Sequence, residues 1–119
     1  MKIPTLIFSF FLLGLTGMVA QESEATKIES KRFKRLYQIN SSLFRSEQPS
    51  KKGFKELEQM GVKTILNLRR VKDDKRKARD TQLQLKHIRL KTAEITEAQV
   101  VAIIKEIQAS EKPVLVHCW

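Results

Sequence analysis

The stretch VKTILNL, residues 62–68, is the strongest indication of the fold. Thr64, Leu66 and Leu68 alternate along one face of this stretch, and Ile65 adds an apolar side chain on the other. A strand that is apolar on both faces lies inside a sheet whose two faces are covered, as in α/β proteins. We therefore predict that these residues form a central strand.

A helix is expected immediately before this strand. Ser50 is a suitable N-cap, because its side-chain oxygen can accept a hydrogen bond from the first helical turn. Phe54, Leu57 and Met60 follow at three-residue spacing, which places them on one face. Gly61 is a typical C-terminal stop, so the predicted helix ends at Met60.

Shorter elements are expected on both sides of this unit. Upstream, residues 36–39 suggest a short strand, and Leu43–Phe44 form a second apolar piece. Downstream, residues 69–85 are so rich in charge that they predict a surface loop or a polar helix. A further short strand is predicted at residues 86–90.

The next helix has the clearest pattern of the chain. Thr96 and Gln99 form a capping box, and apolar side chains recur at i, i+3, i+4 and i+7 from Val100 to Ile107. Pro113 ends this helix, and a last strand begins at Val114. Strands and helices that alternate in this way predict an α/β fold, with a small central sheet flanked by helices.

The N-terminal segment predicts export. After Lys2 the first twenty residues carry no charge and end in small side chains, a pattern typical of a secretory signal peptide. We expect residues 1–20 to be this signal, residues 21–35 a polar and basic linker, and residues 36–119 the folded domain, in a periplasmic or secreted protein. The alternative is an uncleaved membrane anchor, the one case in which we expect membrane contact.

Composition narrows the choice of partners. The formal net charge of +10 favours anionic partners such as phosphates or acidic surfaces, while export makes nucleic acid the least suitable of them, so we expect none. The single cysteine excludes an internal disulfide framework and a CxxC redox site. One cysteine and two histidines that lie far apart make a poor ligand set for a metal ion. We therefore expect no metal and no cofactor.

That cysteine, Cys118, comes directly after the strand that begins at Val114. In open α/β sheets, ligands bind beyond the carboxyl ends of the strands, where a thiol is well placed to act as a nucleophile. A buried structural cysteine is an equally good interpretation of the position alone.

Four short motifs resemble the bacterial branch of the dual-specificity and tyrosine phosphatase family. They are RSEQP at residues 45–49, GVK at 61–63, NLR at 67–69 and VLVHC at 114–118. In that family an Arg-Ser-x-Gln-Pro turn precedes a helix, and a later strand carries the catalytic cysteine. The resemblance covers essentially all of residues 36–118.

The resemblance implies that the protein hydrolyses phosphomonoesters. The family's cysteine attacks phosphorus and forms a cysteinyl phosphate, which water then hydrolyses. It implies that Cys118 is the nucleophile, that His117 supports it, and that the substrate is a phosphorylated protein, lipid or inositol phosphate. The family's general acid is an aspartate before the last helix; here Glu94 is the nearest carboxylate. Arg69 and Arg45 are interpreted as structural partners near the sheet edge.

In the family, a turn, an arginine and a helix follow the cysteine and hold the phosphate. The 119 residues end at Trp119 and do not include them, so we expect a fold that lacks the C-terminal helices, an inactive chain, and partly exposed strands at residues 62–68 and 114–116. Two other interpretations stay open: a non-catalytic, pseudophosphatase-like basic module that binds anionic surfaces or a protein partner, and a rhodanese-like sulfurtransferase, against which the RSEQP motif argues.

Overall fold

The structure is a computed structural model that describes residues 24–119. The predicted signal peptide, residues 1–20, lies outside the described residues, as does the beginning of the predicted linker. In chain order the elements are β1 (Thr26–Lys27), β2 (Tyr37–Asn40), β3 (Leu43–Ser46), α1 (Lys51–Gln59), β4 (Thr64–Asn67), α2 (Lys75–Ala78), β5 (Gln84–His87), the 3₁₀ helix η1 (Thr92–Glu94), α3 (Glu97–Ala109) and β6 (Val114–His117). Within residues 24–119, no helix combines the length and the apolar character needed to cross a membrane.

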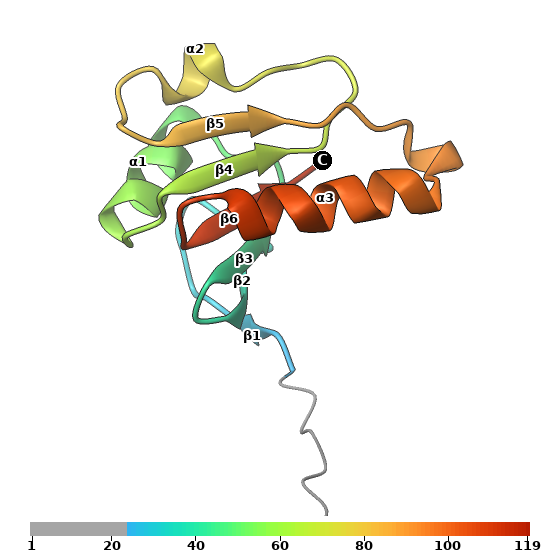
Figure 1. Ribbon diagram of the computed structural model, residues 1–119. Helices are drawn as coiled ribbons and strands as arrows, with labels where there is room; N and C mark the ends of the chain where they lie inside the picture. The colour runs from blue at the N-terminus through green and yellow to red at the C-terminus, as the bar shows by residue number, and fades with distance from the viewer. Residues whose placement is uncertain (1–23) are drawn as a thin grey trace, which may run out of the picture.

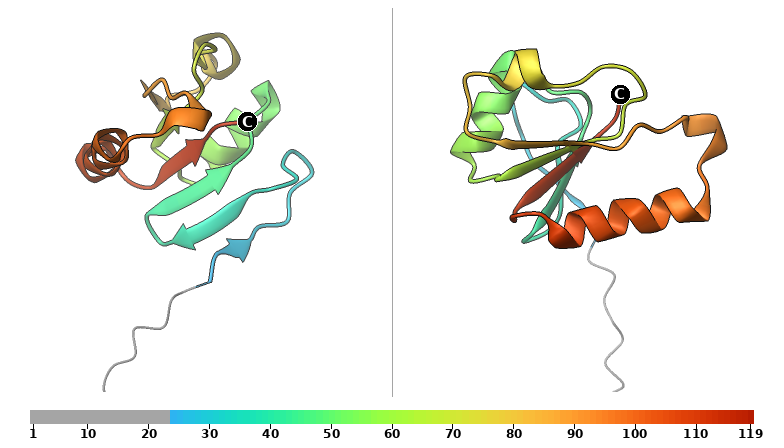
Figure 2. Two further views of the ribbon diagram at one scale, coloured as in Figure 1. Left: turned by 90° about the vertical axis from the view of Figure 1, so that its right-hand side faces the viewer. Right: turned by 45° about the horizontal axis from the view of Figure 1, so that its top comes forward.

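The strands form one sheet in the order β1-β2-β3-β6-β4-β5. The pairs β1–β2 and β2–β3 are antiparallel, whereas β3, β6, β4 and β5 run parallel to one another. Helices α1 and α2 lie on one face of the sheet and α3 lies on the other (Figures 1 and 2). The predicted α/β class, with a small central sheet flanked by helices, is confirmed.

Strand β4 is central, as predicted, since it pairs with β5 on one side and β6 on the other. All four of its residues are buried. The strand begins two residues later than predicted, because the amides of the two residues before it make hydrogen bonds outside β4 and its partners. The Val62 amide donates to the Leu57 carbonyl at 3.1 Å, and the Lys63 amide donates to the Pro113 carbonyl at 2.9 Å.

The main core lies between the sheet and α1, and its centre is formed by residues from both. Helix α1 begins as predicted, with the Ser50 hydroxyl accepting a hydrogen bond from the Gly53 amide at 3.0 Å. Gly61 follows the helix with a φ of 92°, a conformation that glycine adopts without the steric cost of a side chain. The buried cluster consists of Phe33, Leu36, Phe44, Phe54, Leu57, Val62, Ile65, Ala78, Leu83 and Leu115.

The opposite face is covered less completely. The capping box of Thr96 and Gln99 is present, as predicted, but α3 has no buried residue. Val100 is 45% exposed and Ile104 48% exposed, so only part of the predicted apolar stripe faces the sheet. The expectation that the strands would be partly bare is wrong for β4, which is fully buried, and in β6 only Val116 is less than buried. Helix α3 instead exposes Val100, Val101 and Ile104.

Two further expectations need correction. Strand β5 spans Gln84–His87 rather than residues 86–90, because its ladder with β4 begins where Thr64 lies opposite Gln84. The charged segment after β4 contains the short polar helix α2 but is not all surface, since Asp74 and Ala78 are buried. Charge density alone does not reveal that one carboxylate of such a segment turns inward.

Candidate active site

The last residues of the four parallel strands form a row at one edge of the sheet. Ser46 lies opposite His117, which lies opposite Asn67, which in turn lies opposite His87. Cys118 follows β6 directly and therefore stands at this edge. The sequence-based prediction that the thiol lies beyond the carboxyl end of a buried strand is confirmed.

His117 is fixed by contacts on both ring nitrogens. It is 2% exposed, and its Nε2 lies 2.6 Å from Oδ2 of Asp74. Its Nδ1 lies 3.3 Å from the carbonyl oxygen of Cys118. The ring of Phe54, from α1, packs edge-on against it with centroids 6.5 Å apart. The predicted neighbour of the nucleophile is thus joined to the backbone of the cysteine itself.

Asp74 is the site residue that sequence reasoning missed. It lies just before α2 and is 3% exposed, although it belongs to the run of charge at residues 69–85. Its second oxygen, Oδ1, accepts a hydrogen bond from Nε2 of Gln48 at 2.9 Å. Burial raises the pKa of Asp74, but the hydrogen bonds from His117 and Gln48 outweigh it and hold the pKa below the ordinary 3.8. The carboxyl group is therefore ionised at neutral pH.

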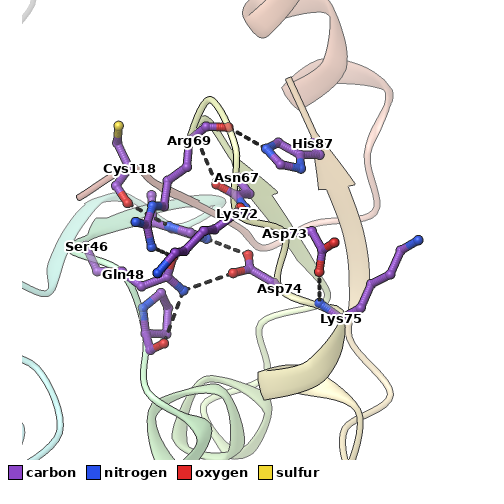
Figure 3. A network of polar contacts seen from close by, with 12 residues as sticks. Ser46, Gln48, Asn67, Arg69, Lys72, Asp73, Asp74, Lys75, His87 and Cys118 are labelled. Carbon is purple, nitrogen blue, oxygen red and sulfur yellow. Dashed lines mark hydrogen bonds and ion pairs between the residues drawn. The ribbon is translucent and has the colours of Figure 1, made fainter. Parts of the chain in front are cut away.

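Arg69 continues the same network. Its Nη1 donates to Oε1 of Gln48 at 2.9 Å, so the Gln48 amide joins Arg69 to Asp74 (Figure 3). Arg69 is 7% exposed, and its guanidinium lies 4.0 Å from the ring centroid of Trp119. Within residues 24–119, its Nε is a buried polar atom with no hydrogen-bond partner. These contacts of Arg69 are structural, as expected. The guanidinium carbon of Arg45 lies 4.7 Å from the ring centroid of Tyr37, which is also a structural contact.

The backbone next to Arg69 is held as firmly as its side chain. The Arg69 amide donates to Oδ1 of Asn67 at 2.8 Å, and the Asn67 side-chain amide donates to the Lys72 carbonyl at 2.8 Å. The His87 ring contacts the Arg69 carbonyl at 2.5 Å. The NLR motif thus ends a strand and fixes the loop that carries Asp74.

The thiol of Cys118 is half-buried and forms no disulfide. In Figure 3 its sulfur points away from the polar network of Gln48, Arg69 and Asp74. The thiol is therefore directed away from the side chains that fix His117 and Arg69.

Two clefts meet at Trp119, the neighbour of this cysteine. One, of about 420 Å³, is lined by Arg70, Lys91 and Glu94 among others. The other, of about 290 Å³, is lined by Arg35 and Arg45 together with Tyr37 and Glu47. Two basic side chains line each cleft, and this favours anionic ligands. Glu94, the carboxylate proposed from sequence, opens onto the first cleft.

No three His, Cys, Asp or Glu side chains gather closely enough to hold a metal ion in the part of the chain that the structure describes. The groups that lie at this edge are a thiol, a buried histidine–carboxylate pair and nearby cations. Such a set is suited to nucleophilic attack on an anionic substrate.

Comparison with solved structures shows the same fold. A crystal structure of Pseudomonas aeruginosa TpbA matches with a TM-score of 0.70 and 24% identity, over 79% of this chain and 58% of that chain. TpbA bearing a cysteine-to-serine substitution, in complex with pTyr, matches with a TM-score of 0.70 and 23% identity, over 79% and 57%. The catalytic core of the PP-IP phosphatase Siw14 from Saccharomyces cerevisiae matches with a TM-score of 0.57 and 19% identity, over 66% and 53%.

The chain thus spans a little over half the length of these structures. No curated protein sequence matches it. Residues 40–119, however, match the family described as "Polymorphic toxin system, DSP-PTPase phosphatase". That match takes in every parallel strand, the RSEQP motif and the His117–Cys118 pair. The chain therefore belongs to the DSP-PTPase phosphatase family, in agreement with the resemblance to bacterial tyrosine and dual-specificity phosphatases that its sequence motifs carry.

Proposed function

We propose that the protein hydrolyses phosphomonoesters with Cys118 as the nucleophile. The thiolate sulfur attacks phosphorus, a P–S bond forms, and the P–O bond to the leaving group breaks. Water then attacks the cysteinyl phosphate and releases inorganic phosphate and the free thiolate. The observation that carries this proposal is the position of the single thiol, at the carboxyl edge of four parallel strands and directly after the buried His117.

The substrate is proposed to be a phosphorylated molecule, with phosphotyrosine as the first candidate. TpbA bound to pTyr supports this choice, and the cations that line both clefts beside Trp119 suit a dianionic group. An inositol phosphate is the second candidate, supported by the PP-IP phosphatase Siw14. The family match supports a hydrolase rather than the non-catalytic basic module.

Glu94 is proposed as the general acid that protonates the leaving oxygen. It is exposed, and it shares the larger cleft with Trp119, the residue after the nucleophile. Asp74 is unsuited to this role because its carboxylate is buried, ionised and already bonded to His117.

Replacing Glu94 tests this role in a polypeptide that continues after Cys118 with the corresponding C-terminal segment of TpbA. We expect Glu94→Gln to slow hydrolysis of an alkyl phosphate by about 10²-fold, the effect typical of losing a general acid. An aryl phosphate with a good leaving group should be affected much less. Glu97→Gln, a matched change in the first turn of α3, is the control. Equal losses for both substrates would contradict the assignment.

A polypeptide limited to these 119 residues is proposed to show negligible turnover. It supplies the nucleophile but not the turn, the arginine and the helix that follow the cysteine in the family motif. Those groups hold the phosphate oxygens through backbone N–H donors and a bidentate guanidinium. Without them an attacking thiolate would face an unbound dianion.

A pair of polypeptides tests both parts of the proposal. One has the 119 residues alone, and the other continues after Cys118 with the corresponding C-terminal segment of TpbA. We expect turnover of an aryl phosphate only from the second, and its loss on Cys118→Ser. A folded chimaera without cysteine-dependent turnover would refute the function. Clear Cys118-dependent turnover by the shorter polypeptide would refute its inactivity.

Export through residues 1–20 is also proposed, on the apolar pattern of that segment alone. Expression in a bacterium, followed by cell fractionation and N-terminal sequencing, tests it. A cytoplasmic product that keeps Met1 to Ala20 would contradict it.

A further inference from the structure

Both ring nitrogens of His117 face oxygen atoms that can only accept hydrogen bonds. Nε2 lies 2.6 Å from a carboxylate oxygen of Asp74, and Nδ1 lies 3.3 Å from the carbonyl oxygen of Cys118. A carbonyl has no proton to donate, and an ionised carboxylate has none either. Only a ring with an N–H on each nitrogen could donate a hydrogen bond to both oxygens.

The burial of this pair shows why Asp74 is needed. The side chains of His117 and Asp74 are 0% and 2% exposed, so neither charge is solvated by water. An isolated imidazolium at this depth would be strongly disfavoured, and a carboxylate in direct contact is what offsets its desolvation. The ring of Phe54, from α1, packs edge-on against His117 and adds no charge.

Gln48 holds the carboxylate in place. Its amide nitrogen donates to Oδ1 of Asp74 at 2.9 Å, and its amide oxygen accepts from Arg69 at 2.9 Å. These two bonds fix the orientation of the amide and leave Oδ2 of Asp74 directed at His117. The glutamine of the RSEQP motif thereby joins the loop after β3 to the segment after β4, which Asp74 in turn joins to the end of β6.

We propose that Asp74 is a positioning residue for the nucleophile: it keeps His117 as an imidazolium whose second N–H holds the Cys118 carbonyl. The inference rests on the proposed function of Cys118. With His117 as an imidazolium, the connected group contains two cations, Arg69 and His117, and one anion, Asp74, so its net charge is positive. Such a charge favours the thiolate, which is the attacking form.

The test measures the ring and the thiol directly, without a phosphate substrate. In the ¹⁵N-labelled 119-residue polypeptide at neutral pH, both ring nitrogens of His117 should give the correlations of an imidazolium. The chain has one other histidine, His87, and a His87→Gln variant assigns the signals. Alkylation of Cys118 by iodoacetamide gives the second readout, since its rate follows the thiolate population.

Asp74→Asn is the decisive variant, because it keeps the shape of the side chain and removes the charge. We expect His117 to become a neutral ring with one N–H, and alkylation of Cys118 to slow about tenfold, the scale of one charge-assisted hydrogen bond. Asp73→Asn is the matched control: it removes the same charge one residue away, from an exposed carboxylate that accepts a hydrogen bond from the Lys75 amide. It should leave both readouts close to those of the unchanged protein.

Three results would overturn the proposal. The first is a neutral His117 ring in the unchanged protein, which decides the matter even if Asp74→Asn fails to fold. The second is an imidazolium that persists in folded Asp74→Asn. The third is equal slowing of alkylation by the two aspartate variants. If the imidazolium and the slowed alkylation are seen while the TpbA chimaera shows no turnover, the proposed function fails and the assignment of Asp74 stands.

Discussion

At the scale of single residues, the interior of this protein contains charge in one connected group. Arg69, Asp74 and His117 are the buried ionisable side chains among residues 24–119, and Gln48 links the first two. A buried charge is tolerated when it is paired and hydrogen-bonded, and costly when it is not. The group therefore ties the loop after β3, the segment after β4 and the end of β6 to one another at the carboxyl edge of the sheet.

The lowered pKa of Asp74 predicts how stability depends on pH. Its pKa in the folded protein lies below the ordinary 3.8, so its stabilising effect is complete above that value and is lost as the pH falls toward the folded-state value. Urea unfolding of the unchanged protein should therefore show a free energy of unfolding that declines below about pH 5, and Asp74→Asn should lack the part of this decline that protonation of Asp74 causes.

Asp80 provides the control for that experiment. Its pKa is also lowered, by a hydrogen bond and ion pair with Lys51 at 3.1 Å, but both side chains are about half exposed. Solvent and salt screen such a pair, so Asp80→Asn should alter the pH profile little at 0.5 M salt. An Asp74→Asn profile that matches the unchanged protein would contradict the assignment.

Some of the site could be predicted from the sequence at this scale. Cys118 and His117 follow an apolar strand, and strand ends in α/β sheets are where ligands bind, so their place could be inferred. Asp74 could not, because it is one of several charges in its segment and nothing local tells which of them turns inward. Its partners, Gln48 and His117, lie 26 and 43 residues away along the chain.

At the scale of elements, helix ends were predicted best, because capping depends on neighbours in sequence. The Ser50 cap, the Gly61 stop and the Thr96–Gln99 box are all present. Strand limits were predicted less well, since a strand ends where its partner does. The predicted strand at residues 86–90 is shifted for this reason, although the Ile88 amide still reaches the Asn67 carbonyl at 2.9 Å beyond β5.

The two long helices should respond differently to loss of their caps. Helix α1 buries Phe54 and Leu57 in the core, so Ser50→Ala should lower the free energy of unfolding of the whole domain by about 1 kcal/mol. Helix α3 buries no residue, so Thr96→Ala should fray its first turn with little global effect.

Amide hydrogen exchange and urea unfolding together separate these effects. Thr96→Ala should speed exchange in the first turns of α3 and leave the urea midpoint nearly unchanged, whereas Ser50→Ala should shift the midpoint. Thr92→Ala, in the exposed 3₁₀ helix before α3, is the control. A midpoint shift of equal size for Thr96→Ala would mean that α3 belongs to the cooperative core.

At the scale of the whole molecule, β6 is the strand that joins two halves. It pairs with β3 through residues 43–46 and with β4 through residues 64–67, and Leu115 sits fully buried between them. Without β6, the antiparallel strands β1–β3 and the parallel pair β4–β5 share no edge. The integrity of the sheet therefore depends on a segment of four residues.

Removal of residues 114–119 should abolish cooperative folding. The shortened polypeptide would leave two strand edges unpaired and open the core at Leu115, a loss of several kcal/mol against a typical stability of about 5–15 kcal/mol. Near-UV circular dichroism and thermal unfolding measure the result. Removal of residues 118–119 alone should keep a cooperative transition, and a sharp transition without β6 would refute this account.

The central place of β6 also has a consequence for synthesis. The ribosome releases β1 to β5 before it releases the strand that must lie between β3 and β4. Until then the nascent polypeptide has no complete sheet, and pairing must bridge segments that were translated at well-separated times. A chaperone or protease that binds the nascent polypeptide before then meets an open chain, and the thiol cannot acquire its surroundings until translation has passed its own codon.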